Sequence, residues 1–529
     1  MISERGEEFK TYFNSLSNEN YIEKNIILEL ITSSGIFLND VRFGDIHPET
    51  SIASVLYSLP EKIDYDTFHD LILSNTFLFT KIIEKDLIIP DWDIFNNDIS
   101  DIFLSCKNHN LGKVADYIPQ LAKVSDKFYG LSICTTDGQQ LERGDTSVPF
   151  CIQSCSKPIT YLIATDINGA DYVHNFIGRE PSGRNFNELC LNSDKLPHNP
   201  LINSGAIMAA SLVNYREPIA DRFDTVMDYW SKLAGNTKIN FSNSVYLSER
   251  TTADRNYCLG YMMQESLAFS QGKDIKYKRD WNNNDLKDSL DFYFQCCSIE
   301  VNCKQAGIIA ATLANGGICP VTDEKVFSPD IVKNALSLMS SCGMYDYSGE
   351  WAYTIGLPAK SGVSGIIMGI IPNVMGIAVF SPKLDDIGNS SRGIEFFKKL
   401  TAKYPFHVYD NIINSKKKSV LNYEIANEEN NLYTLLYAAG NGDLKSIQSI
   451  YAKDFDLNTS DYDGRTALHL AASEGNYEIV EYLLEKQVDK NKKDRWSNMP
   501  IDDAMRERED KDELTKEKFN DIIRLLENE

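Results

Sequence analysis

Apolar residues recur at three- and four-residue steps over the first hundred positions of the chain. The segments IEKNIILELITSSGI (22–36) and YDTFHDLILSNTFLFTKIIEKDLIIP (65–90) show this spacing, which is typical of amphipathic helices. Pro90 ends the second segment. The pattern predicts a helical N-terminal domain over residues 1–105. It has no D-x-D-x-D-G loop, so the usual set of calcium ligands is absent.

The pattern changes between residues 106 and 412, where short β-rich runs mix irregularly with helical stretches. YGLSICTT (129–136) and MGIIPNVMGIAVFSP (368–382) are the clearest predicted strands. Because strands and helices do not alternate regularly, we expect an α+β layered fold rather than a doubly wound sheet. The polar segment 413–430 is predicted to be a linker.

The last hundred residues repeat. YTLLYAAGNGD begins at Tyr433, TALHLAASEGN thirty-three residues later at Thr466, and MPIDDAMRERE a further thirty-three later at Met499. This period and the T-x-L-H-x-A sequence are typical of ankyrin repeats, which we assign to residues 431–529. Tight inner-helix packing is expected at Ala438, Ala471 and Ala504, and turns at Gly442 and Gly475. Such repeats bind partners or brace the rest of the chain, and they do not catalyse reactions.

Composition narrows the functional classes. Asp and Glu number 76 against 53 Lys and Arg, a formal net charge of −23, which argues against nucleic acid or an anionic membrane as partner. The sequence contains no apolar run of about 18 residues or more. Eleven cysteines without a signal peptide indicate reduced thiols in a soluble, intracellular protein. Cysteine and histidine spacings match no metal site, so a structural zinc site is not expected.

Candidate catalytic residues lie in CIQSCSKPIT (151–160). Proline is tolerated in the first turn of a helix, so Pro158 places a helix start near Ser154. Ser154 and Lys157 then share one face. A neutral lysine can take the proton of a serine hydroxyl, and the positive end of the helix favours an oxyanion. This is the S-x-x-K pair of serine acyl-transfer enzymes.

The spacing alone is weak evidence, because it also occurs at Ser270–Lys273 and Ser415–Lys418. Only Ser154–Lys157 is flanked by apolar runs, VPFCI and ITYLIA, which would dehydrate the lysine and lower its pKa. GLPAKSGVSG (356–365) adds a K-S-G sequence at Lys360, similar to the K-T-G strand of β-lactamases, although glycine-rich strands also occur for packing alone. The S/Y-x-N element of those enzymes is missing, which argues against a β-lactam or peptidoglycan substrate.

Nine motifs in order resemble the serine-dependent glutaminases: KVADYIPQLA (113–122), GDTSVPFCIQSCSKP (144–158), EPSGRNFN (180–187), PHNPLINSGAI (197–207), SERTTADRNYCLGY (248–261), DFYFQCCSIEV (291–301), ATLANGGICP (311–320), SLMSSCGMYDYSG (337–349) and GLPAKSGVSG (356–365). The helical region and ankyrin tail make the chain similar to the animal kidney-type, phosphate-activated branch. The resemblance implies a β-lactamase-like α/β/α sandwich over residues 106–412, an EF-hand-like N-terminal domain, and hydrolysis of L-glutamine to L-glutamate and ammonia without a cofactor.

The resemblance also implies roles for single residues. Ser154 would attack the side-chain amide and form a γ-glutamyl intermediate, Lys157 would take the serine proton, and Tyr345 would relay protons. The amides of Ser154 and Val363 would form the oxyanion hole. Glu249 would pair with the substrate ammonium, because a buried charge needs a partner. The other implied substrate-binding residues are Tyr117, Asn203, Asn256 and Tyr293.

Plainer interpretations exist for two of these residues. Glu249 could form a surface ion pair with Arg250 or Arg255, and Asn203 could cap a helix. For the whole chain, the alternatives are an amidase of different specificity, acting on asparagine or a peptide amide, and an inactive ankyrin scaffold. The presence of Ser154, Lys157 and Tyr345 argues against the scaffold.

The chain also departs from the animal members of the family. The segment 267–287 is longer than the corresponding segment of those members. The loop after EPSG carries Arg184-Asn185, Glu188 and Cys190 where those members have leucine-arginine, lysine and phenylalanine. The resemblance implies that this loop gates the site and lies at a tetramer interface. We therefore expect a homo-oligomer, a dimer or tetramer, with weaker phosphate dependence. The acidic N-terminus argues for the cytosol, since presequences are poor in acids, whereas the family analogy implies mitochondria.

Overall fold

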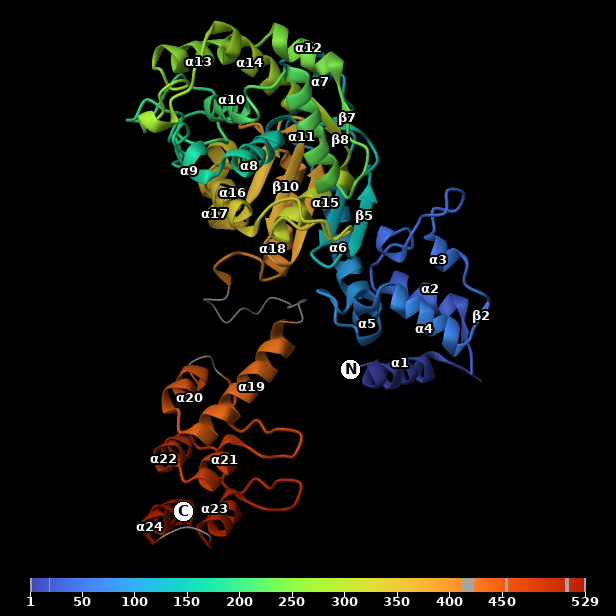
Figure 1. Ribbon diagram of the computed structural model, residues 1–529, viewed down its shortest axis with the longest axis vertical. Coiled ribbons are helices and arrows are strands. Elements are labelled where there is room, and N and C mark those ends of the chain that lie inside the picture. Colours follow the sequence, from blue (N-terminus) through green and yellow to red (C-terminus); the bar gives the residue numbers. More distant parts are fainter. Residues whose placement is uncertain (1, 19, 411–422, 452–454, 510–512, 528–529) are drawn as a thin grey trace. The chain divides into compact units, whose positions relative to one another are not determined.

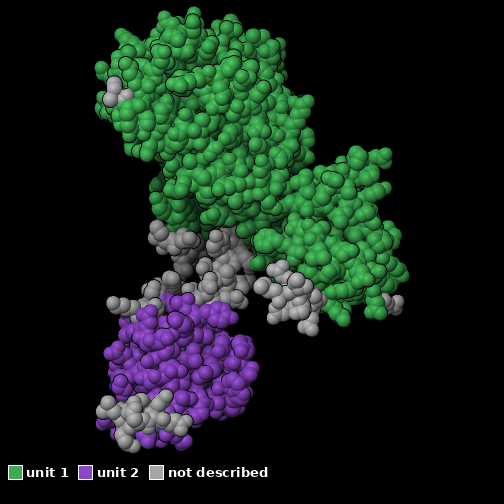
Figure 2. Space-filling view, viewed as in Figure 1, with its two compact units in different colours: residues 1–420 green, residues 421–529 purple. Residues whose placement is uncertain are grey.

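The chain forms two compact units, residues 1–420 and 421–529 (Figures 1 and 2). The computed structural model describes residues 2–18, 20–410, 423–451, 455–509 and 513–527. Among these residues, no helix is both long and apolar enough to cross a membrane. All eleven cysteines are free thiols.

The first hundred residues are helical, as the spacing of apolar residues predicts. The helices are α1 (Ile2–Leu16), α2 (Lys24–Ser33), α3 (Ser54–Tyr57), α4 (Tyr65–Ser74), α5 (Thr76–Glu84) and α6 (Trp92–Cys106), with strand β1 (Ile22–Glu23) paired to β2 (Lys62–Ile63). The long pattern over 65–90 is two helices, because the Asn75 side chain accepts a hydrogen bond from the Leu78 amide and starts α5. The boundary near residue 105 stays a prediction.

An antiparallel sheet of five strands, in the order β5-β4-β11-β10-β9, forms the centre of the first unit. The strands are β4 (Gly130–Thr135), β5 (Gln140–Gly144), β9 (Ala359–Gly362), β10 (Ile366–Ile371) and β11 (Met375–Phe380). The two predicted β-rich runs are β4 and the β10–β11 hairpin. Antiparallel pairing throughout explains why strands and helices do not alternate along the sequence.

Helices cover both faces of this sheet. Gly376 on β11 lies so close to Ala310 and Ala311 of α15 (Cys303–Ala314) that a β-carbon would not fit, and Gly369 on β10 lies as close to Phe397 of α18 (Ser391–Lys403). Gly376 pairs with Ile370, the neighbour of Gly369, so the two glycines point to opposite faces. The layers are therefore helix, sheet and helix, as the implied α/β/α sandwich requires.

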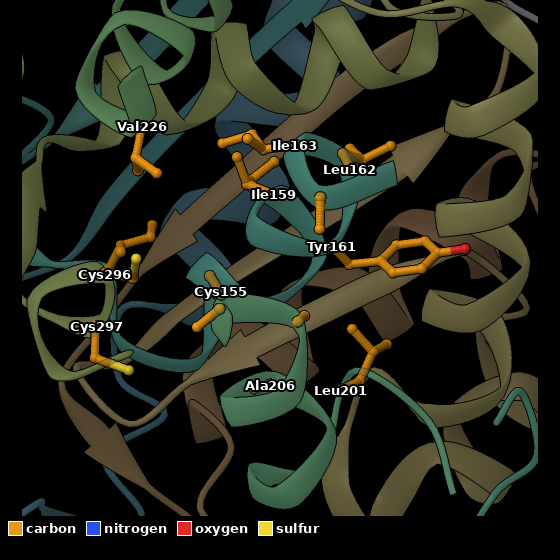
Figure 3. Close-up of a cluster of buried hydrophobic side chains, with 14 of the residues drawn as sticks. Cys155, Ile159, Tyr161, Leu162, Ile163, Leu201, Ala206, Val226, Cys296 and Cys297 are labelled. Atoms are coloured by element: carbon orange, nitrogen blue, oxygen red, sulfur yellow. The ribbon is translucent and has the colours of Figure 1, made fainter. Parts of the chain in front are cut away.

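The largest apolar core lies on the α15 side and contains α8 (Ser156–Asn168). Every residue of α8 from Ser156 to Thr165 is buried, and Figure 3 shows Ile159, Leu162 and Ile163 within this core. The other elements of the unit are α7 (Pro119–Ala122), α9 (Ala170–Val173), α10 (Asn203–Leu212), α11 (Ile219–Leu233), α12 (Asn243–Thr251), α13 (Asp254–Glu265), α14 (Asn283–Cys297), α16 (Pro329–Cys342), α17 (Ser348–Thr354), β3 (Lys113–Val114), β6 (Phe150–Cys151), β7 (Asn240–Phe241), β8 (Ile299–Val301) and β12 (Lys383–Leu384).

The second unit consists of helix pairs with the predicted repeat. The helices are α19 (Tyr423–Asn441), α20 (Leu444–Tyr451), α21 (Ala467–Glu474), α22 (Tyr477–Glu485), α23 (Pro500–Glu509) and α24 (Glu513–Glu527). Ala438, Ala471 and Ala504 are buried, and Gly442 and Gly475 adopt φ angles of 77° and 76°, which glycine permits at helix ends. Helix α19 begins before the predicted end of the linker at residue 430. Residues 413–422 of that linker lie outside the described residues.

Candidate active site

Ser154 lies where strand β6 leads into helix α8. A 3₁₀ turn, η2 (Gln153–Cys155), joins them, and α8 begins at Ser156. The predicted helix start near Ser154 is therefore confirmed to within two residues. Gln153 holds a left-handed φ of 51°, a conformation that is rare outside glycine and that clusters at functional sites.

Lys157 is buried in the first turn of α8, with a relative exposure of 1%. Its Nζ donates a hydrogen bond to Oδ1 of Asn203 over 2.6 Å. Burial lowers the pKa of Lys157 to about 7, and the positive charge of Lys360 also lowers it. A lysine with this pKa is substantially neutral near pH 7 and can accept a proton.

Lys360 of the K-S-G sequence is buried on β9. Its Nζ donates to the carbonyl oxygens of Gly343, over 3.0 Å, and Ser361, over 2.7 Å. The same nitrogen lies 4.4 Å from the centroid of the Tyr345 ring, a distance typical of a cation–π contact. Burial lowers the pKa of Lys360 to about 8.

Tyr345 connects this lysine to the serine. Its phenol donates to the Ser361 carbonyl over 3.2 Å. Burial raises the pKa of the phenol, and the nearby Ser154 side chain lowers it. A protonated phenol at this position can donate or pass on a proton. Tyr345 has a left-handed φ of 54°, like Gln153.

A cavity of about 340 Å³ opens beside Ser154. Seven of the residues singled out from the sequence line it: Tyr117, Ser154, Asn203, Glu249, Asn256, Tyr293 and Val363. Tyr345 lines a neighbouring cavity of about 600 Å³ instead, and Phe186 lines both. The Phe186 ring contacts the Tyr345 ring with centroids 4.9 Å apart. The structure thus brings together residues from 117 to 363 in one site.

Glu249 is buried, and its Oε1 accepts hydrogen bonds from the Tyr117 hydroxyl over 2.6 Å and from Gln153 Nε2 over 3.1 Å. Tyr117 is 49% exposed as a whole, but its hydroxyl reaches inward to this carboxylate. Burial raises the pKa of Glu249, and both hydrogen bonds lower it. Arg250 pairs with Asp291 over 2.9 Å, so it does not form the alternative ion pair with Glu249. In the described part of the chain, Glu249 has no cationic partner.

Asn203 is the first residue of α10, whose N-cap is Ile202, so it does not cap the helix as the plainer interpretation has it. Its Nδ2 donates to Asn256 Oδ1 over 2.9 Å, and its backbone amide donates to the Phe186 carbonyl over 3.0 Å. Asn203 therefore connects Lys157, α13 and the loop that contains Phe186. Tyr293 is buried; burial raises the pKa of its phenol, and the nearby Cys297 raises it further.

Several residues of the cavity were not found from the sequence: Gln153, Phe186, Asn187, Thr252, Ala253, Arg255, Phe294 and Cys297. All eight lie within the motifs quoted above, so their positions in those motifs could have indicated them. Within the described residues, no three His, Cys, Asp or Glu side chains gather as metal ligands would.

Comparisons with known proteins point to one family, the glutaminases, along most of the chain. A family model described as Glutaminase matches residues 112–409, and one described as Ankyrin repeats (3 copies) matches residues 406–494. Putative glutaminase 2 of Caenorhabditis elegans is 46% identical over 445 residues, covering 84% of this chain and 72% of that protein. The glutaminase liver isoform, mitochondrial, of Mus musculus is 46% identical over 477 residues, covering 90% of this chain and 77% of that protein.

Two solved structures are also similar. The probable glutaminase ybaS is 32% identical with a TM-score of 0.53, covering 59% of this chain and 97% of that chain. Mglu in its glutamate form is 32% identical with a TM-score of 0.54, covering 60% of this chain and 69% of that chain.

Proposed function

The chain belongs to the glutaminase family and hydrolyses L-glutamine to L-glutamate and ammonia, and we propose that the reaction passes through a γ-glutamyl ester of Ser154. The observation that carries this proposal is the buried Lys157, whose pKa is lowered to about 7, in the turn that follows the serine. We further propose that the sandwich is a β-lactamase-like scaffold.

In the first step, Ser154 Oγ attacks the carbonyl carbon of the side-chain amide, and its proton passes to Nζ of Lys157. The oxyanion that forms is stabilised by the amides of Ser154 and Val363. Val363 follows the last residue of β9, and within the described residues its amide has no acceptor. The amide nitrogen of the substrate takes up this proton from Lys157 and departs as ammonia. The γ-glutamyl ester of Ser154 remains.

In the second step, water attacks the ester carbonyl, and its proton passes to neutral Lys157. The C–O bond to Ser154 breaks, the serine regains a proton, and L-glutamate leaves. Tyr345 is the relay in both steps, because its buried phenol lies beside the Ser154 side chain, which lowers the pKa of the phenol. Lys360 holds the ring of Tyr345 through the cation–π contact and keeps positive charge near the developing oxyanion.

Recognition of the free amino acid follows from the polar lining of the cavity. The buried Glu249 carboxylate pairs with the substrate ammonium, which offsets the cost of burying either charge alone. Asn203, Asn256, Tyr117 and Tyr293 shape the rest of the site through hydrogen bonds.

The rest of the chain serves assembly in this proposal. The ankyrin unit binds a protein partner, and the catalytic unit forms a homo-oligomer, a dimer or tetramer. The helix–strand–helix segments around β1 and β2 support the further proposal that the N-terminal region is EF-hand-like. The name of the mouse relative includes the word mitochondrial, which favours that compartment.

Ammonia release by the purified chain tests the proposed function. Free L-glutamine, free L-asparagine and a peptide that contains a glutamine residue are supplied at equal concentration, with and without phosphate. We expect turnover of free L-glutamine well above the other two. Faster release from asparagine or the peptide would establish the related amidase instead, and no release from any of them would favour the inactive scaffold.

A further inference from the structure

Tyr345, the proposed proton relay, lies in a backbone turn that its residue type does not favour. The turn is η4 (Tyr345–Tyr347), which leads into helix α17 at Ser348. Tyr345 has a φ of 54°, in the left-handed region that residues with a bulky side chain rarely adopt. Such a conformation persists only where the surrounding contacts hold it. Those contacts therefore decide where the phenol lies.

The contacts of the Tyr345 ring do not fix its backbone. The ring centroid lies 4.4 Å from Nζ of Lys360 and 4.9 Å from the centroid of the Phe186 ring. Both contacts act on the aromatic group at the end of the side chain. They leave the backbone on either side of the Tyr345 α-carbon to be held by other groups.

The Ser348 hydroxyl bonds to the backbone on both sides of Tyr345. Its Oγ accepts a hydrogen bond from the Met344 amide over 3.0 Å and donates one to the Tyr345 carbonyl over 2.7 Å. Asn389 adds a longer bond, from Nδ2 to the Met344 carbonyl over 3.3 Å. Ser348 is 8% exposed, and Met344 and Asn389 are fully buried, so bulk water does not replace these bonds.

We propose that Ser348 is a positioning residue, whose hydroxyl holds Tyr345 in the left-handed turn and thereby keeps its phenol beside Ser154. Without this hydroxyl, the buried Met344 amide lacks its acceptor, and φ of Tyr345 relaxes toward the favoured right-handed region. The phenol oxygen moves furthest, because it lies at the end of the side chain. A displacement of about 1 Å can lower a rate about a hundredfold. This assignment rests on the proposed function, in which Tyr345 is the relay.

The test is a double-mutant cycle between Ser348 and Tyr345 in the full-length chain. Ammonia release from L-glutamine gives kcat and KM for the wild type, Ser348→Ala, Tyr345→Phe and the double variant, and thermal unfolding gives the stability of each. Ser348→Thr keeps the hydroxyl. Thr312→Val on α15 is the matched control, because it removes another buried hydroxyl, which donates to the carbonyls of Leu233 and Ile308.

For Ser348→Ala we expect kcat to fall at least about tenfold with KM within about twofold of the wild type, because a displaced relay slows proton transfer more than it weakens binding. In Tyr345→Phe the phenolic hydroxyl is already missing, so the added Ser348→Ala should lower kcat less than about twofold further. Ser348→Thr should keep most of the wild-type kcat. Thr312→Val should lose stability and keep its kcat.

Two results would overturn the assignment of Ser348 alone: an unchanged kcat in folded Ser348→Ala, or the same fractional loss of kcat with and without the Tyr345 hydroxyl. If Ser348→Ala does not fold, Ser348→Cys, which has a weaker donor and acceptor, takes its place in the cycle with the same expectations. Full activity of Tyr345→Phe would overturn the relay and this assignment with it. Absence of ammonia release by the wild type would overturn the proposed function itself.

Discussion

Nζ of Lys157 and Oδ1 of Asn203 lie 2.6 Å apart in a hydrogen bond that fixes the candidate base. The partner is a neutral amide, whereas a carboxylate would stabilise the charged lysine and raise its pKa. The bond thus orients the amine without keeping it protonated. This relationship accounts for how a lysine can serve as a base near neutral pH.

A first prediction concerns pH. The pKa of Lys157 is lowered to about 7, so the amine is neutral above that pH and protonated below it. Activity should therefore fall as pH drops through about 7. Lys360→Met removes a positive charge that lowers the pKa of Lys157, so the acidic limb of the kcat/KM profile should move to higher pH. A limb that stays in place, or moves to lower pH, would show that Lys157 is not the titrating base.

A second prediction concerns the substrate ammonium. Glu249→Gln keeps the shape of the side chain but removes its charge, which should cost about 2–3 kcal/mol of binding and appear mainly as a higher KM. The wild type should hydrolyse glutaramic acid, which is glutamine without its amino group, far more slowly than L-glutamine. Equal rates on both compounds would assign Glu249 to another role.

The active site shows which features a sequence can predict. Ser154 and Lys157 are close in sequence, and Pro158 indicates where the helix starts. The rules for helix starts and helix spacing therefore suffice to predict that the two side chains lie together. Tyr117 and Glu249 are 132 residues apart, and only packing of the whole fold brings them together. The left-handed φ of Gln153 likewise has no local signal, because glutamine does not favour it. Family resemblance supplied a role for Glu249 but none for Arg255, which lines the same cavity.

The ankyrin residues show the same contrast. The repeat placed Ala438, Ala471 and Ala504 in the interior, because a fixed period repeats one packing position. The start of α19 was not predicted, since YEIANEENN reads equally well as a polar linker and as a helix.

A third prediction concerns the two units. A chain ending at Val420 keeps the complete first unit, so it should fold and hydrolyse L-glutamine at a rate within about threefold of the full chain, because repeats contact mainly their neighbours. Thermal unfolding and ammonia release check this. An insoluble or inactive product would mean that the repeats belong to the catalytic core.

A fourth prediction concerns phosphate. Arg184 Nη1 lies 2.7 Å from Glu188 Oε1 in an exposed ion pair, so the charge that could attract phosphate to this loop is already compensated. Activity should depend only weakly on phosphate, and Glu188→Lys should increase the dependence. Activity and sedimentation are measured together across a phosphate titration. A wild type that is inactive and dimeric without phosphate, and active and tetrameric with it, would contradict this prediction.

The central claim is that Ser154 forms the covalent bond to the substrate, and ammonia release by Ser154→Ala tests it most directly. The account predicts a loss of turnover of at least about a thousandfold, while binding of L-glutamine, followed by calorimetry, stays within a few-fold of the wild type. Turnover by Ser154→Ala at a rate comparable to the wild type would contradict the account.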